Sequence, residues 1–98
     1  MFEKARNAAA DLASCFATDF PSSLQDMTGR KAQDMYQRAL GGLKNRAGEL
    51  QRESRFGIIA RIILARRFQA ALRTGGYSGA ILRQATSELA SALTFAGK

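Results

Sequence analysis

Residues 55–73 constrain the fold more than any other part of the chain, because their composition is that of one long helix. Ser54 stands before this stretch as a candidate N-cap, and the pair Gly75 and Gly76 follows it as a C-terminal stop. At about 100° per residue, the apolar side chains of the stretch point to almost every side of the helix. A helix of this kind is buried on most sides, so we expect it to pack inside a helical bundle or against another chain.

The arginines of this stretch separate into two groups on a helical wheel. One group falls within a third of the circumference and alternates with apolar side chains; it either reaches water from a buried helix or binds anions. Its arginines are Arg52, Arg55, Arg66, Arg67 and Arg73, and the apolar residues between them are Ile59, Ile63 and Ala70. Arg61 lies on the opposite side, among apolar side chains. Because an unpaired buried charge is very costly, we expect Arg61 to face a carboxylate of this chain or of a partner.

The rest of the chain predicts helices on either side of the central one. Apolar residues from Phe2 to Phe16 recur at steps of three and four, which predicts a helix, and Pro21 excludes helical geometry soon after them. A capping-box spacing that begins at Ser22 predicts a second helix from about Ser23, and Ser78 caps a last helix. We expect helices at about 3–17, 23–52, 55–74 and 79–96, within a single all-helical domain that spans residues 1–98.

Gly41 and Gly42 form a weak point in the second helix, since each glycine costs about 1 kcal/mol relative to alanine in a helix interior. The apolar stripe stays in phase across the pair, so we favour one continuous helix over two shorter helices hinged there. One proline and few β-branched residues outside the central stretch argue against a sheet. The predicted fold class is therefore all-α, a small bundle of four helices or of three with one long bent helix.

The charge balance predicts an acidic binding partner. The chain carries a formal net charge of +7, and eleven of its fifteen basic residues are arginine. Arginine makes planar, bidentate contacts to carboxylates and phosphates, so this bias favours recognition rather than mere solubility. A positive surface attracts nucleic acid, an anionic membrane or an acidic protein face.

Few side chains suit catalysis or metal binding. The chain has no histidine, and its one cysteine, Cys15, lies at the edge of an apolar stripe, which is typical of a small buried hydrophobe. A nucleophilic cysteine needs a lowered pKa and a base, and a zinc site needs more ligands than the chain offers. The carboxylates are spread singly along the sequence. We therefore expect neither enzyme activity nor a bound metal or cofactor.

The single cysteine also predicts the compartment. It cannot form an internal disulfide, which fits a reducing, cytoplasmic setting. The apolar runs are much shorter than the roughly 18 residues of a membrane-spanning helix. Leu12 to Cys15 have the order of a lipoprotein cleavage box, but Glu3, Asn7 and Asp11 interrupt the apolar run that should precede it, so we expect a helix there.

Together these features favour a non-catalytic protein–protein interaction module, such as a small regulator, adaptor or inhibitor. We expect it to present a basic and apolar helix to an acidic partner or to its own copy in a homo-oligomer, because three other helices are too few to cover the central one. The candidate partner-binding residues are Arg55, Ile59, Arg61, Ile63, Arg66, Arg67 and Arg73. The alternatives are a nucleic-acid-binding protein with an arginine stripe and a peripheral membrane-surface binder.

Overall fold

The protein is an all-α bundle. The computed structural model describes residues 2–27 and 29–96. In that part of the chain, the helices are α1 (Glu3–Asp19), α2 (Arg30–Ser54), α3 (Ile58–Thr74) and α4 (Gly79–Ala96), with a short 3-10 turn, η1 (Ser22–Leu24), between the first two. The predicted fold class is confirmed, in its four-helix form.

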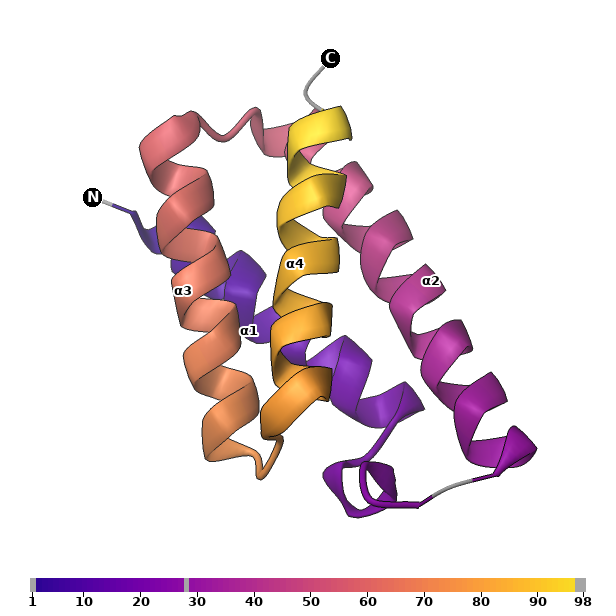
Figure 1. Ribbon diagram of the computed structural model, residues 1–98. Coiled ribbons are helices and arrows are strands. Elements are labelled where there is room, and N and C mark those ends of the chain that lie inside the picture. Colours follow the sequence, from indigo (N-terminus) through magenta and orange to yellow (C-terminus); the bar gives the residue numbers. More distant parts are fainter. Residues whose placement is uncertain (1, 28, 97–98) are drawn as a thin grey trace.

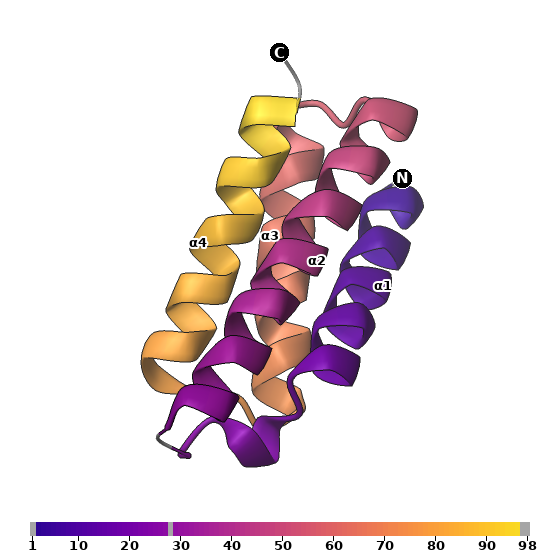
Figure 2. The same cartoon turned by 90° about the vertical axis from the view of Figure 1, so that its right-hand side faces the viewer.

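The four helices alternate in direction, so that α1 and α3 run the same way, antiparallel to α2 and α4 (Figures 1 and 2). Each of α1 and α4 packs against both α2 and α3, which places α2 and α3 at opposite corners of the bundle. The chain therefore crosses one end of the bundle between α2 and α3, as the top of Figure 1 shows. α1 and α3 become parallel neighbours as a result.

An aromatic cluster fills the core near the opposite end. Phe16, Phe20, Tyr36 and Tyr77 pack with ring centroids 5.2 to 6.3 Å apart. Their polar tips are satisfied, since the Tyr77 hydroxyl donates to the Phe20 carbonyl and the Tyr36 hydroxyl donates to Gln84 Oε1 at 2.8 Å. The remainder of the buried face of α1 is mostly alanine, which lets its neighbours approach closely.

The second helix begins later than the sequence predicted. Residues 22–24 form only a 3-10 turn, and α2 starts at Arg30, after Gly29 with a positive φ of 131°. A contact that is remote in sequence explains the difference. The side-chain amide of Gln25 donates to the Gly76 carbonyl at 2.6 Å and accepts from the Ser78 N–H at 2.9 Å, which holds this segment against the turn between α3 and α4.

Gly41 and Gly42 lie inside α2, which is continuous through them. A Cβ built on Gly42 would lie 3.4 Å from Asp19 Oδ2, at the end of α1. A Cβ on Gly41 would meet nothing within 4 Å, so only Gly42 faces the end of α1, and the pair lies within one unbroken helix.

The predicted start of the central helix at residue 55, with Ser54 as its N-cap, was wrong. Ser54 is the last residue of α2, and Arg55 ends that helix in the left-handed conformation, with φ 49° and ψ 54°. Phe56 then packs into the core, where its carbonyl accepts a hydrogen bond of 3.0 Å from the buried Gln51 side chain. Gly57 is the N-cap of α3, with no side-chain cap. Burial of Phe56 thus sets the boundary between α2 and α3, which lies a few residues later than the sequence predicted.

The bundle itself does not bury the central helix on most sides, so burial against another chain is the part of that expectation that stays a prediction. The fully buried side chains of α3 are Leu64, Phe68 and Leu72, whereas Ile58, Ile59 and Ile62 are 68%, 64% and 51% exposed. The reason is geometric, because α3 packs mainly against α1 and α4, which leaves its outer half uncovered. No helix in the described part of the chain is long and apolar enough to cross a membrane.

Candidate partner-binding groove

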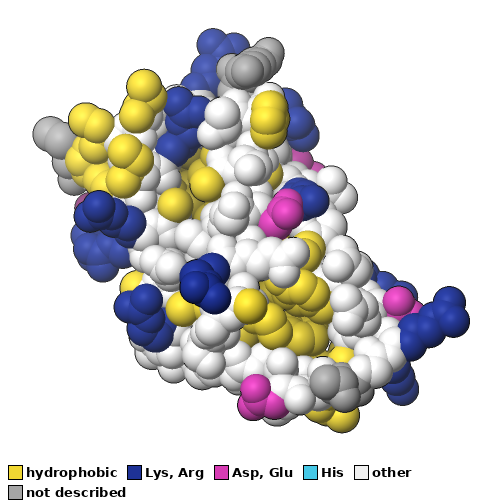
Figure 3. Space-filling view, in the orientation of Figure 1, with side chains coloured by type: hydrophobic (Ala, Val, Ile, Leu, Met, Phe, Trp, Pro, Cys, Tyr) yellow, Lys and Arg dark blue, Asp and Glu magenta, His cyan; other side chains and the backbone are white. Residues whose placement is uncertain are grey.

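The outer face of α3 combines apolar and basic side chains. Ile59, Ile62, Arg66 and Arg73 follow one another at helical spacing, and all four are exposed. Figure 3 shows apolar side chains gathered over the N-terminal ends of α1 and α3, with basic side chains beside them. A surface of this composition favours contact with another macromolecule over plain exposure to water.

Beside this face, a line of hollows follows the seam where α1 and α3 run in parallel. One hollow of about 540 Å³ and a neighbour of about 550 Å³ share Arg6 of α1 and Arg67 of α3. The first is lined by Phe2, Arg6, Ile63, Arg66, Arg67 and Ala70, and the second by Glu3, Arg6, Asn7, Ala9, Ala10, Arg67 and Ala71. A third hollow of about 380 Å³ continues the seam between Ala17 and Gly75. We call this line of hollows the α1–α3 groove.

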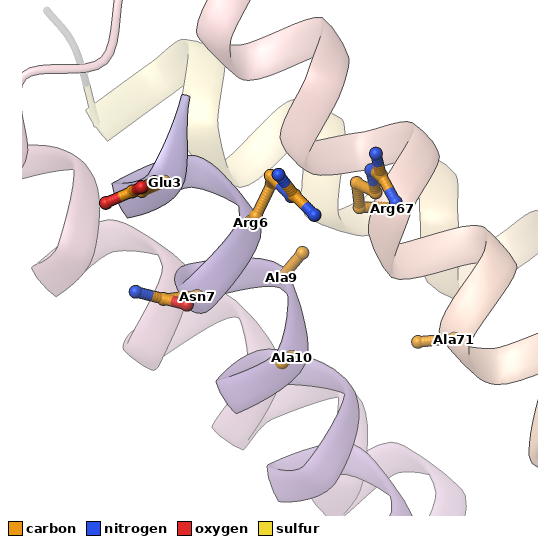
Figure 4. Close-up of a pocket in the computed structure, with 7 residues that line it drawn as sticks. All are labelled: Glu3, Arg6, Asn7, Ala9, Ala10, Arg67 and Ala71. Atoms are coloured by element: carbon orange, nitrogen blue, oxygen red, sulfur yellow. The ribbon is translucent and has the colours of Figure 1, made fainter. Parts of the chain in front are cut away.

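Two arginines face each other across the α1–α3 groove. Figure 4 shows the side chains of Arg6 and Arg67 extending from opposite walls into the space between the helices. Glu3 and Asn7 also line this hollow, but in Figure 4 their side chains extend away from Arg67, and Glu3 forms no ion pair with either arginine. Guanidinium forks held on two walls are suited to a carboxylate or phosphate placed between them.

The ion pairs among the described residues involve only Lys44 and Arg46, and none lies on this surface. Asp11 Oδ2 lies 3.0 Å from Arg46 Nε, Glu49 Oε2 lies 3.2 Å from Arg46 Nη1, and Glu88 Oε2 lies 2.9 Å from Lys44 Nζ. Among the described residues, no ion pair involves Arg6 or any arginine of α3. The sequence has no Asp or Glu between residues 53 and 88, so α3 carries arginine charge with no acid of its own.

The predicted site residues divide among several places. Arg73 and Ile59 lie on the outer face of α3, Ile63 and Arg67 line the α1–α3 groove, and Arg66 is exposed at the edge between the two and lines the groove as well. Arg55 lies in the connection before α3 and lines a separate hollow of about 580 Å³ with Phe2 and Ala60. The prediction that Arg52 and Arg55 share one helical stripe with the α3 arginines was wrong, because α2 and α3 are separate helices at opposite corners.

Arg61 differs from its expected setting. It lies at the N-terminal end of the buried stripe of α3 but is only partly buried, and it forms no ion pair with the residues that the structure describes. Partial exposure lets an arginine cover apolar surface with its stem while its charge stays hydrated. The expected partner carboxylate is thus not supplied within the described chain.

Sequence reasoning missed two groups of residues in this region. Ile58 and Ile62 belong to the exposed surface of α3, and Phe2 and Arg6 form the α1 wall of the groove. The spacing of four between Phe2 and Arg6 places both on one edge of α1 and was available from the sequence. The sequence does not indicate which helix lies against that edge, because the neighbour depends on the topology of the bundle.

The remaining chemistry of the described residues does not mark a reactive centre. They contain no group of three or more His, Cys, Asp or Glu placed to hold a metal ion. The Cys15 thiol has a raised pKa because it is partly buried and because Asp19 and Asp11 lie near it, so the unreactive thiol form is favoured.

No protein-family model matches the chain, and no curated protein or solved structure is significantly similar to it.

Proposed function

We propose that the protein is a non-catalytic interaction module, a small regulator, adaptor or inhibitor that presents α3 to an acidic surface of a partner protein. One observation carries this proposal. Ile58, Ile59 and Ile62 are each more than half exposed on a helix whose arginines have no carboxylate partner among the described residues. Burying an isoleucine side chain contributes about 1.5–3 kcal/mol, so a partner surface with apolar residues at its centre and acidic residues around them gains from the isoleucines and from the arginines.

The proposal places the protein in the cytoplasm, because its one cysteine suits a reducing compartment.

Self-association through the same surface is less favourable than binding to a different protein. A two-fold dimer brings the same patch of both copies together, and α3 has no acidic residue that could pair with the arginines of the other copy. Like charges facing each other at an interface cost several kcal/mol. The acidic partner is therefore a different chain.

Nucleic acid is the second candidate, because the unneutralised arginines Arg6, Arg66, Arg67 and Arg73 suit phosphate contacts. It accounts less well for the exposed isoleucines, which gain little from a phosphate backbone. Membrane-surface binding is a third candidate that uses both kinds of side chain. The α1–α3 groove distinguishes a protein from a membrane, since a concave, arginine-walled groove suits a protruding segment better than a flat lipid surface.

The test is capture from the source cell, followed by reconstitution of the captured protein with the purified module. We expect the Ile59→Asp/Ile62→Asp double change to weaken the reconstituted complex by about 100-fold or more, since two apolar contacts are replaced by charge. Met27→Asp is the matched control, because Met27 is 59% exposed and lies outside α3. Circular dichroism checks that each variant folds.

Three outcomes oppose the proposal. Affinity that is equal in the α3 variant and in the Met27 control would show that α3 is not the binding surface. Capture that nuclease treatment abolishes and that falls steeply with salt would favour nucleic acid. Co-sedimentation with anionic but not neutral vesicles, lost in the same α3 variant, would favour the membrane surface.

A further inference from the structure

We propose that the α1–α3 groove seats an acidic amphipathic helix of the partner protein, with a carboxylate of that helix held between Arg6 and Arg67. This binding mode rests on the proposed function. It specifies which kind of partner segment binds and where it lies on the bundle.

The groove has the length and the floor that a bound helix requires. α1 and α3 contain 17 residues each, which at a rise of 1.5 Å per residue gives parallel walls of about 25 Å. The side chains along the seam are mostly small: Ala9, Ala10, Ala13, Ala17, Ala70 and Ala71. Small side chains let a third helix lie close to the other two, and a helix of about four to five turns fills this length.

An apolar anchor point lies at the end of the groove where both helices begin. Phe2 and Ile63 line the hollow of about 540 Å³ from opposite walls. Ile59, 64% exposed, lies one helical turn before Ile63 on the same side of α3. Large apolar side chains at intervals of three and four residues on a partner helix can fill this hollow and cover Ile59 together.

The charge of the groove sets the chemistry of the flanks of the bound helix. Arg6 and Arg67 extend into the groove from the two walls, and Arg66 lines the same hollow as both of them (Figure 4). Arginine binds a carboxylate through two parallel hydrogen bonds, which suits Asp or Glu side chains on either side of an apolar stripe.

The contact between α2 and α4, compared with the groove between α1 and α3, supports this assignment. Across the seam between α2 and α4, the Tyr36 hydroxyl donates to Gln84 Oε1 at 2.8 Å and Lys44 Nζ lies 2.9 Å from Glu88 Oε2. Between α1 and α3 themselves, the described residues form no side-chain hydrogen bond or ion pair, and the Tyr77 hydroxyl bonds to the Phe20 carbonyl only beyond the ends of both helices. Polar side chains thus link α2 to α4 directly, whereas Arg6 and Arg67 on the two walls of the groove stay free to bind an anionic partner.

A second copy of the chain does not supply this occupant through its own equivalent face, because that face is basic. A phosphate backbone supplies the charge but leaves the hollow between Phe2 and Ile63 without an apolar side chain. An acidic amphipathic helix matches both the charge and the apolar hollow.

A fluorescein-labelled helical peptide of about 18 residues, with leucine at every third or fourth position and glutamate on both flanks, is the probe. We expect saturable binding by anisotropy, lost when every glutamate is replaced by lysine. Arg6→Gln/Arg67→Gln should weaken binding about tenfold or more, because charge-assisted hydrogen bonds are lost. Arg30→Gln/Arg38→Gln on α2 is the matched control and should change binding less than about twofold, because those exposed arginines lie on a helix away from the groove.

The outcomes separate this binding mode from the proposed function. Peptide binding that is unaffected by Arg6→Gln/Arg67→Gln, or absent altogether, overturns the groove assignment, even where the captured partner still depends on Ile59 and Ile62. If partner binding does not depend on Ile59 and Ile62, and peptide binding does not depend on Arg6 and Arg67, then both the proposed function and the groove assignment are overturned. Duplex DNA or anionic vesicles that bind as tightly as the peptide, with the same dependence on Arg6 and Arg67, would replace the acidic helix as the occupant. Both arginines are exposed and unpaired among the described residues, so thermal unfolding should show that the glutamine variant folds normally.

Discussion

Replacing Gly41 and Gly42 with alanine measures how strongly α2 depends on an unbroken helix. Both glycines lie in the interior of α2, where alanine is favoured over glycine by about 0.8–1.0 kcal/mol per residue. A Cβ at Gly41 would meet nothing within 4 Å, and a Cβ at Gly42 would meet only Asp19 Oδ2, at 3.4 Å. Because neither methyl group clashes, both substitutions should keep most of the gain in helix propensity.

The double variant should therefore raise the free energy of unfolding by about 1.5–2 kcal/mol. For a domain of this size, 1 kcal/mol moves the Tm by about 4–8 °C, so we expect a rise of roughly 6–16 °C. Thermal and urea unfolding followed by far-UV circular dichroism measure both quantities. The control is Gly76→Ala, which should lower the Tm, because Gly76 has a φ of 102° and a Cβ there would lie 3.2 Å from Ser22 Oγ. A Tm that stays the same or falls in the Gly41/Gly42 variant would mean that the chain bends at the pair, as in two hinged helices.

Two further predictions concern the core. Phe68→Ala should lower the free energy of unfolding by about 3–5 kcal/mol because the ring is fully buried, whereas Ile62→Ala, at a half-exposed position, should change it by less than about 0.5 kcal/mol. Similar losses in urea unfolding would show that α3 is turned differently about its axis. Burial raises the pKa of Tyr36, helped by Glu88, and the pKa of Tyr77. The folded protein then keeps phenolic protons that the unfolded chain releases above pH about 10, so stability from these groups is complete below that pH and falls above it. Urea midpoints in a series of alkaline buffers, with tyrosinate absorbance, check the sign, and a midpoint that rises with pH would contradict it.

The helices could be predicted wherever their signals are local. Steps of three and four from Phe2 to Phe16 locate α1, and the glycines after Thr74 locate the end of α3. The start of α2 and the break before α3 depend on tertiary contacts instead. Gln25 hydrogen-bonds a turn about fifty residues away in sequence, at Gly76 and Ser78, and nothing in the local pattern indicates that Arg55 adopts the left-handed conformation.

The candidate site was predictable in part for the same reason. Arginines and isoleucines at helical spacing on α3 are visible in the sequence, so Ile59, Ile63, Arg66 and Arg67 could be named as candidates. A pattern that is apolar on nearly every side does not reveal which side faces solvent. Arg6 joins the site only because α1 and α3 are parallel neighbours, and that follows from the crossing of the chain between α2 and α3.

The connection between α2 and α3 is short, since only residues 55–57 separate the two helices. Helix axes packed 8–10 Å apart place opposite corners of a four-helix bundle about 11–14 Å from each other. The four Cα steps from Ser54 to Ile58 reach roughly 13–14 Å when extended. This short tether, with the buried Gln51 side chain bonded to it, fixes the N-terminal end of α3 before any partner arrives. Ile58 and Ile59 follow directly on this anchored connection, and an anchored surface loses less conformational entropy when a partner covers it.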